Sequence, residues 1–140
     1  MISKSEQETA DIASNFAKHI KAPATITLCG DLGAGKSAFA RAFLRAKGVK
    51  GAISSPTFSL VNLYSSDDQT QLAHMDLYRL EDDEQAYQAG IEEILHDNNT
   101  ISLVEWPERL SWMMPSELIK ININHCGDSE REIIIEGYEL

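Results

Sequence analysis

A glycine-rich segment early in the chain constrains the fold more than any other feature. Residues 30–37 read GDLGAGKS and match the pattern G-x-x-x-x-G-K-[ST] at every position. Glycines let the backbone curl so that successive N–H groups face an anion, which a side chain would obstruct. The lysine supplies a cation for the β- and γ-phosphates of a nucleotide, and the following hydroxyl supplies a ligand for Mg²⁺. The candidate nucleotide-binding residues of this loop are Leu32, Gly33, Ala34, Gly35, Lys36 and Ser37.

The sequence on both sides of this loop has the pattern that a phosphate-binding loop requires. Residues 24–29 form a short apolar run with β-branched members, which predicts a buried strand. Residues 36–47 place apolar side chains at helical spacing, and Gly48 is a suitable stop for that helix. A loop that follows a strand and opens a helix directs the positive end of the helix at a bound anion. The context therefore favours a nucleotide site over an empty strand–turn–helix.

The rest of the chain predicts a three-layer α/β domain of the P-loop NTPase type, with a mainly parallel central sheet and antiparallel additions. Its 140 residues fit one domain, 1–140. An amphipathic helix is expected over residues 3–20, where Ser3 and Glu6 fit a capping box. Short helices are expected near Asp82 and Pro107. Further strands are expected at 58–64, 71–77 and 100–104, with an antiparallel pair at 118–124 and 131–137.

Two acidic residues follow apolar runs that predict strands. Asp76 follows residues 72–75, and Glu105 follows residues 101–104. An acid directly after such a strand emerges at its C-terminal edge, where ligands bind in open α/β sheets. We expect these acids to hold Mg²⁺ or to orient the water that attacks a nucleotide, although solvated carboxylates give the same pattern. The sequence does not divide the two roles between them.

Two further candidates are less specific. Trp106 follows Glu105 directly and is interpreted either as a core aromatic or as a residue at the nucleotide or partner surface. Thr57 lies after the second expected helix, where many phosphate-loop proteins place a switch segment that senses the γ-phosphate. A simple entry into the next strand explains Thr57 equally well.

Composition narrows the possible partners and locations. The formal net charge is −10 at pH 7, so the chain repels nucleic acid unless a basic patch forms. No apolar run approaches the roughly 20 residues that span a bilayer, and residues 1–8 are too polar for a secretory signal. A cytoplasmic location is therefore expected. Cys29 and Cys126 lack C-x-x-C spacing and are expected to be reduced, buried thiols.

Five blocks of the sequence recur in the same order in one known family. They are GDLGAGKS at 30–37, SPTFSLVNLY at 55–64, HMDLYRL at 74–80, GIEEIL at 90–95 and EWPER at 105–109. The phosphate loop is shared by many families, but the other blocks together are far more specific. On these residues the chain resembles TsaE, the bacterial ATPase family of tRNA threonylcarbamoyladenosine (t6A) biosynthesis. The resemblance runs from about the first helix to the last strand pair.

This resemblance implies a protein that binds ATP with Mg²⁺ and hydrolyses it slowly. It would dock on a protein complex of the threonylcarbamoyl transferase and its inactive paralogue, and its ATP cycle would support repeated turnover of that complex. It would contact tRNA only indirectly, which agrees with the negative charge. The resemblance also implies that Thr57 lies in a switch-like segment and that Trp106 matters for activity.

The matching motif positions imply roles for the other candidates. Lys36 would bind phosphates, and Ser37 and Glu105 would hold Mg²⁺. Asp76 would assist hydrolysis through water or the metal shell. The nucleotide base would lie between the N-terminal segment and the loop near Glu130.

Other functions use the same kind of loop. A small kinase would need an acceptor site and a mobile lid with arginines, whereas this chain has five scattered arginines and no insertion long enough for a lid. A guanine-nucleotide switch commonly carries an N-K-x-D loop, and no asparagine here is followed by lysine. A nucleotide-gated binding module without significant turnover stays compatible with the loop and with the resemblance.

Overall fold

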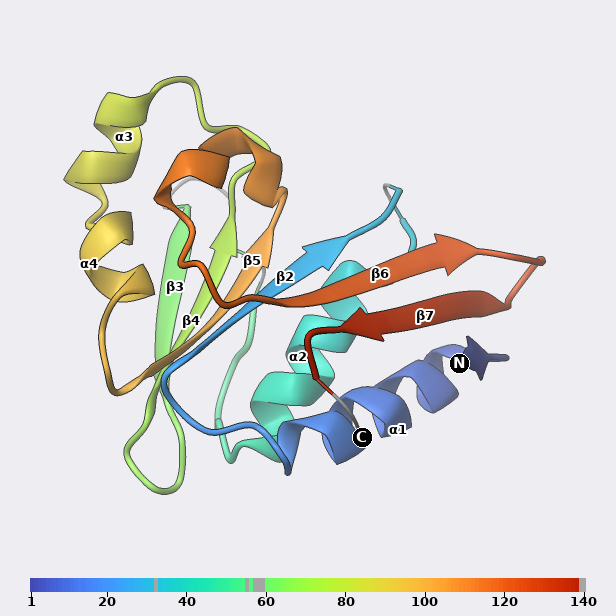
Figure 1. Ribbon diagram of the computed structural model, residues 1–140. Helices are drawn as coiled ribbons and strands as arrows, with labels where there is room; N and C mark the ends of the chain where they lie inside the picture. Colours follow the sequence, from blue (N-terminus) through green and yellow to red (C-terminus); the bar gives the residue numbers. More distant parts are fainter. Residues whose placement is uncertain (32, 55, 57–59, 139–140) are drawn as a thin grey trace.

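A computed structural model describes residues 1–31, 33–54, 56 and 60–138 of the chain. Within these residues, seven strands form one sheet in the order β1-β7-β6-β2-β5-β4-β3 (Figure 1). The strands are β1 (Ile2–Ser3), β2 (Ala24–Cys29), β3 (Val61–Ser65), β4 (Gln71–Asp76), β5 (Thr100–Glu105), β6 (Ile119–His125) and β7 (Arg131–Glu136). Strands β6, β2, β5 and β4 pair in parallel, whereas β7, β1 and β3 are added antiparallel to their neighbours. The predicted parallel centre with antiparallel additions is confirmed.

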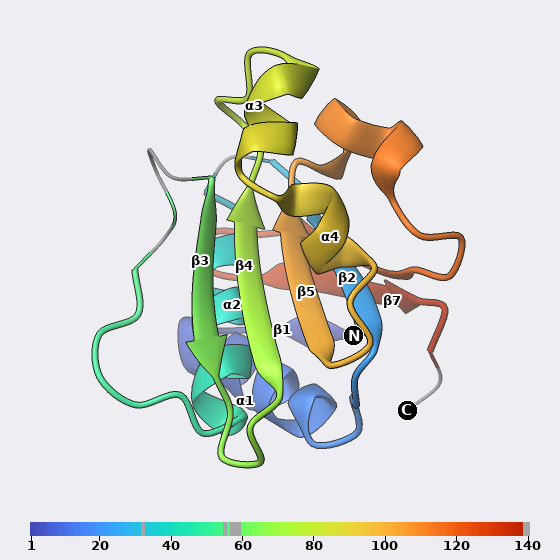
Figure 2. The ribbon, with the colours of Figure 1, turned by 90° about the vertical axis from the view of Figure 1, so that its left-hand side faces the viewer.

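Helices cover both faces of this sheet, as the three-layer prediction requires. Helices α1 (Glu6–Ala17) and α2 (Lys36–Ala46) pack on one face, whereas α3 (Asp83–Gln88), α4 (Ile91–Leu95) and the 3₁₀-helix η1 (Pro107–Met113) pack on the other (Figure 2). On β5, Leu103 joins the first core and Val104 the second, because successive strand side chains point to opposite faces. No helix in the described part of the chain is both long and apolar enough to cross a membrane.

The first helix begins later than the sequence predicts, and its predicted capping box is wrong. Ser5 is the N-cap, and its hydroxyl accepts a hydrogen bond from the Glu8 N–H at 3.1 Å. Ser3 instead lies in β1, which pairs with β7, and its hydroxyl is 2.7 Å from that of Thr9. Long-range strand pairing therefore removes Ser3 from the helix, and the next serine takes its place.

Strand boundaries also differ from the predicted ones in ways that matter for the site. The strand expected at 58–64 spans Val61–Ser65 in the described residues, which do not include 57–59. Strands β4 and β5 end at Asp76 and Glu105, so both candidate acids are the last residues of their strands. Both cysteines are free thiols, but neither is fully buried as predicted, because Cys29 is half-buried at the end of β2 and Cys126 is exposed in the turn between β6 and β7.

Candidate nucleotide-binding site

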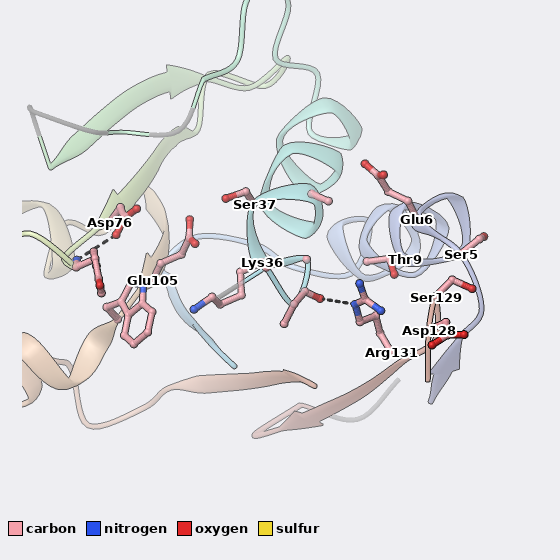
Figure 3. A pocket seen from close by; sticks show the side chains of 16 residues that line it. Ser5, Glu6, Thr9, Lys36, Ser37, Asp76, Glu105, Asp128, Ser129 and Arg131 are labelled. Atoms are coloured by element: carbon pink, nitrogen blue, oxygen red, sulfur yellow. Dashed lines mark hydrogen bonds between the residues drawn. The ribbon is translucent and has the colours of Figure 1, made fainter. Parts of the chain in front are cut away.

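A pocket of about 560 Å³ lies at the C-terminal edge of the parallel strands. Its walls come from the phosphate loop with the start of α2, the ends of β4 and β5, the start of α1 and the turn before β7 (Figure 3). Small-molecule sites commonly enclose roughly 300–1,000 Å³. The pocket is therefore large enough for a nucleotide, and it lies where the sequence predicted one.

The phosphate loop connects β2 to α2 as predicted, and two glycines show why. Gly30 has a φ of +142°, and a Cβ built on it would lie 2.0 Å from the carbonyl oxygen of Ile123 in β6. Gly35 is the N-cap of α2 with a φ of +107°, a conformation that L side chains rarely adopt. The predicted loop residues that line the pocket are Gly33, Ala34, Gly35, Lys36 and Ser37. Leu32 lies outside the described residues.

Lys36 is nearly buried and has no acidic partner among the described residues. Its side chain is part of the pocket wall, and the residue is 5% exposed. The Nζ atom donates to the carbonyl oxygen of Gly30 at 2.8 Å and lies 4.0 Å from the ring centroid of Trp106. No carboxylate of the described residues comes within ion-pair distance of this ammonium. A carbonyl dipole and an aromatic face only partly offset a buried charge, so phosphate oxygens fit this position.

The two predicted acids lie next to each other at the pocket. Asp76 and Glu105 are register partners at the ends of β4 and β5, and both line the cavity. Glu105 is 3% exposed, whereas Asp76 is less buried and accepts a hydrogen bond from the Tyr78 N–H at 3.1 Å. Burial raises the pKa of Asp76, the Tyr78 hydrogen bond opposes this, and the Glu105 charge adds to the rise. The site therefore holds two carboxylates in different environments.

His74 holds Glu105 in place, which the sequence analysis did not predict. Its Nε2 atom lies 2.6 Å from Glu105 Oε2, and both side chains are almost fully buried. An ionised carboxylate only accepts hydrogen bonds, so the tautomer of His74 with the proton on Nε2 is the one that donates to a Glu105 carboxylate. His74 Nδ1 is buried without a hydrogen-bond partner among the described residues. The sequence signals for His74 are its place at the start of the HMDLYRL block and its position on β4, two residues before Asp76 and on the same face of the strand.

The oxygen ligands that the sequence predicts for Mg²⁺ are present in the pocket. Ser37 and Glu105 both line it, and Figure 3 shows their side chains on the same side of α2 as Asp76. Mg²⁺ usually takes one or two protein oxygens and completes its shell with water and substrate phosphates. The described residues contain no group of three or more His, Cys, Asp or Glu side chains that would hold a metal ion. This donor set fits a metal that arrives with a nucleotide.

Trp106 packs against the core, as one interpretation predicts, and its place at a nucleotide or partner surface stays a prediction. Its ring packs on the core beneath α3, α4 and η1, and it also lines the pocket. The ring centroid lies 5.0 Å from that of Tyr78, and the residue caps η1 with a φ of +59°. Thr57 lies outside the described residues, so its switch role stays a prediction.

One wall of the pocket comes from residues of the N-terminal segment and of the turn before β7, the region where the resemblance implies that the nucleotide base lies, and that placement of the base stays a prediction. The wall residues are Ser5, Glu6 and Thr9 at the start of α1, and Asp128, Ser129 and Arg131 before and in β7. Arg131 donates from Nε to the carbonyl oxygen of Ala34 at 3.0 Å and so ties β7 to the phosphate loop. This wall has no local motif, because the pairing of β1 with β7 brings the two ends of the chain together.

Comparison with known proteins agrees with this geometry. The family profile described as threonylcarbamoyl adenosine biosynthesis protein TsaE matches residues 3–133. The tRNA threonylcarbamoyladenosine biosynthesis protein TsaE of Bacillus subtilis is 39% identical over 127 residues, covering 91% of this chain and 78% of that protein. That of Rickettsia bellii is 38% identical, covering 93% and 89% respectively. The crystal structure of Bacillus subtilis YdiB superposes with a TM-score of 0.77 at 33% identity, covering 96% of this chain and 82% of that one. The chain therefore belongs to the TsaE family.

Proposed function

We propose that this chain binds Mg-ATP in the pocket, hydrolyses it slowly and supports t6A modification of tRNA by nucleotide-dependent docking on a protein complex. Membership of the TsaE family supports the role in t6A biosynthesis. The observation that carries the nucleotide chemistry is the meeting of Lys36, Ser37, Asp76 and Glu105 in one pocket beside the phosphate loop.

Phosphate binding follows from the loop and from Lys36. Backbone N–H groups at the start of α2 have no partner within the helix, and they carry its positive end. A triphosphate at this point meets those groups together with the Lys36 ammonium, which lacks a counter-ion among the described residues. On binding, Lys36 exchanges a carbonyl partner for charged phosphate oxygens, a stronger hydrogen bond.

Hydrolysis is assigned to the strand-end acids. Ser37 and Glu105 would hold Mg²⁺, which neutralises developing charge on the phosphates when it is bound. His74 keeps the Glu105 carboxylate in one orientation, as outer-shell partners of metal ligands do. Asp76 is less buried and is not held by His74, so it is the acid that we assign to orienting water.

A slow intrinsic rate is expected from the arginines. Arginine fingers accelerate phosphoryl transfer by roughly 10³–10⁵. Among the described residues that line the pocket, Arg131 is the only arginine, and its guanidinium donates to the carbonyl oxygens of Ala34 and Glu130. Lys36 is thus left as the side-chain cation for the transition state, so substantial turnover would need help from a partner.

The proposed partner is the threonylcarbamoyl transferase with its inactive paralogue, in the cytoplasm. The net charge of −10 favours contact with protein surfaces over direct contact with tRNA. Nucleotide would control docking, because the pocket is built from three strands, two helices and both ends of the chain. Ligand binding there can therefore reposition several surface segments together.

Calorimetry with Mg-ATP and Mg-GTP tests the proposal. Lys36→Ala should lose ATP binding by 100-fold or more, whereas Lys50→Ala, an exposed lysine after α2, should bind as the wild type does. Glu105→Gln should retain ATP within a few-fold and lose its Mg²⁺-dependent turnover. The purified transferase pair should coelute with the wild-type chain in Mg-ATP but not without nucleotide. Wild-type ATP affinity in Lys36→Ala would overturn the site, and nucleotide-independent coelution would overturn the docking.

A further inference from the structure

The exposed aromatic side chains of the described residues gather on one part of the surface. Tyr78, Tyr87 and Trp112 are 43%, 50% and 55% exposed. Tyr87 in α3 and Trp112 in η1 have ring centroids 6.1 Å apart and form what we call the aromatic pair. Figure 2 shows α3 and η1 next to each other at one end of the sheet. A pair of large exposed rings that bridges two helices is unusual on a surface with no partner.

The aromatic pair lies among elements of concentrated negative charge. Residues 81–97, which include α3 and α4, hold seven acidic residues and no lysine or arginine. All seven are exposed, and we call them the acidic stretch: Glu81, Asp82, Asp83, Glu84, Glu92, Glu93 and Asp97. Because this segment has no lysine or arginine, its net charge is −7, compared with −10 for the whole chain. A large share of the net negative charge therefore lies in the segment that contains α3, the helix that carries Tyr87.

We propose that the aromatic pair and the acidic stretch dock a protein surface rich in arginine and lysine. This inference rests on the proposed function, because it places the contact through which the chain would join its complex. An arginine guanidinium can stack on the face of Tyr87 or Trp112 and still pair with a neighbouring carboxylate. Tyrosine, tryptophan and arginine are also the residues that dominate binding energy at protein interfaces.

The negative charge of the acidic stretch favours a basic protein surface over RNA or a second copy of this chain. RNA would bring phosphates to a stretch of seven acids without a base, which the field of the protein disfavours. A second copy of the chain would bring the same acidic stretch against itself, since a two-fold contact is isologous. A basic protein surface is the class that gains from both the rings and the carboxylates.

The aromatic pair and the acidic stretch, together called the docking face, are connected to the nucleotide pocket through Trp106 and Tyr78. Trp106 lines the pocket near Lys36 and is the N-cap of η1, which is kinked at Leu110 (φ −136°, ψ 41°) and carries Trp112 beyond the kink. Tyr78 also lines the pocket and packs on the Trp106 ring. A partner seated on Trp112 therefore contacts the segment that follows the kink at Leu110, and the turn before that kink adjoins the nucleotide site through Trp106. This connection is the route by which nucleotide would influence docking.

Binding of the transferase pair in Mg-ATP tests the proposal by surface plasmon resonance. Trp112→Ala and Tyr87→Ala should each weaken the complex at least tenfold and leave ATP affinity unchanged. Leu63→Ala, at an exposed apolar residue of β3, is the matched control and should bind as the wild type does. Glu84→Lys should weaken the complex more than Glu136→Lys on β7, although both change the net charge equally. Wild-type affinity in Trp112→Ala, or equal effects of the two charge reversals, would overturn the docking face.

A second experiment judges the face even if the transferase pair proves not to bind the wild-type chain. A synthetic decapeptide of arginine is titrated into the ¹⁵N-labelled protein, and the amide shifts are mapped. Shifts concentrated at residues 81–97 and 107–113, and reduced in Trp112→Ala, support the proposal. Shifts spread evenly over the acidic residues of the chain, or equal shifts at these residues on adding bulk tRNA, would overturn it. If the transferase pair does not bind but the peptide still shifts the amides of residues 81–97 and 107–113, the proposed partner is refuted and the docking face is not.

Discussion

Two glycines of the phosphate loop should fail in opposite ways when each is replaced by alanine. Gly30 and Gly33 both have positive φ, +142° and +78°, so both substitutions carry a backbone cost of about 1–2 kcal/mol. Their surroundings differ completely. A Cβ on Gly30 would lie 2.0 Å from the Ile123 carbonyl oxygen, whereas a Cβ on Gly33 has no atom within 4 Å.

The magnitude for Gly30→Ala follows from that contact. Real Cβ atoms essentially never approach closer than 3.0 Å, so β2 and β6 must separate locally by at least about 1 Å. Such a shift loosens the last ladder positions, where Cys29 pairs with Asn122. Two lost backbone hydrogen bonds at about 1 kcal/mol each, added to the backbone cost, give a loss of at least about 3 kcal/mol. Gly33→Ala should lose only the backbone cost.

Nucleotide affinity should show the reverse order. Gly33 lines the pocket, so an added methyl group occupies space that phosphate would fill. Urea denaturation measures stability, and calorimetry at a temperature where both variants are folded measures ATP affinity. Gly30→Ala should be the less stable variant with nearly normal affinity, and Gly33→Ala the more stable one with at least tenfold weaker binding. If the two variants lose equal free energy of unfolding, the positive φ alone determines the cost of each substitution. That result would refute the argument from the Ile123 contact.

Other features give predictions that are independent of nucleotide. Phe16→Ala should lower the free energy of unfolding by about 3–5 kcal/mol in urea denaturation, because the ring is fully buried between α1 and α2. Iodoacetamide at pH 8 should modify exposed Cys126 well before Cys29, because burial and then the Glu108 charge raise the pKa of the Cys29 thiol. NMR titration of the Asp68 carboxyl should give a pKa of about 2, because two hydroxyls and a backbone N–H donate to it. Its contribution to stability should be present above pH 4 and disappear as the pH falls through 2.

The sequence predicts the centre of the site because its signals there are local. The G-x-x-x-x-G-K-[ST] pattern specifies a strand, a turn and a helix within a few residues, and β2 and α2 match it. Asp76 and Glu105 each follow an apolar run, so their place at the strand ends needs only the alternation and length of β4 and β5. Parallel pairing then brings the two acids together without further information.

The rest of the pocket depends on contacts between distant residues. Ser3 looks like a helix cap, but it forms a two-residue strand with β7, and this pairing carries the start of α1 to the phosphate loop. Arg131 is 97 residues from Ala34 in the chain, and no spacing rule connects them. The wall that α1 and β7 supply therefore depends on strand order, which a single sequence does not specify.

The proposed division of roles between Asp76 and Glu105 also depends on a contact between distant residues, although both acids belong to the predicted part of the site. In the sequence, Asp76 and Glu105 have equivalent positions after equivalent strands. The structure separates them through His74, which lies on the same face of β4 as Asp76 but shares a hydrogen bond with Glu105 on the neighbouring strand. Glu105 is buried and held by His74, which suits the metal-ligand role proposed for it, whereas Asp76 accepts the Tyr78 N–H among the described residues and keeps access to the pocket. Replacing His74 with phenylalanine would remove this difference in how the two carboxylates are held. The contact joins residues 31 positions apart, which the HMDLYRL and EWPER blocks contain but do not link.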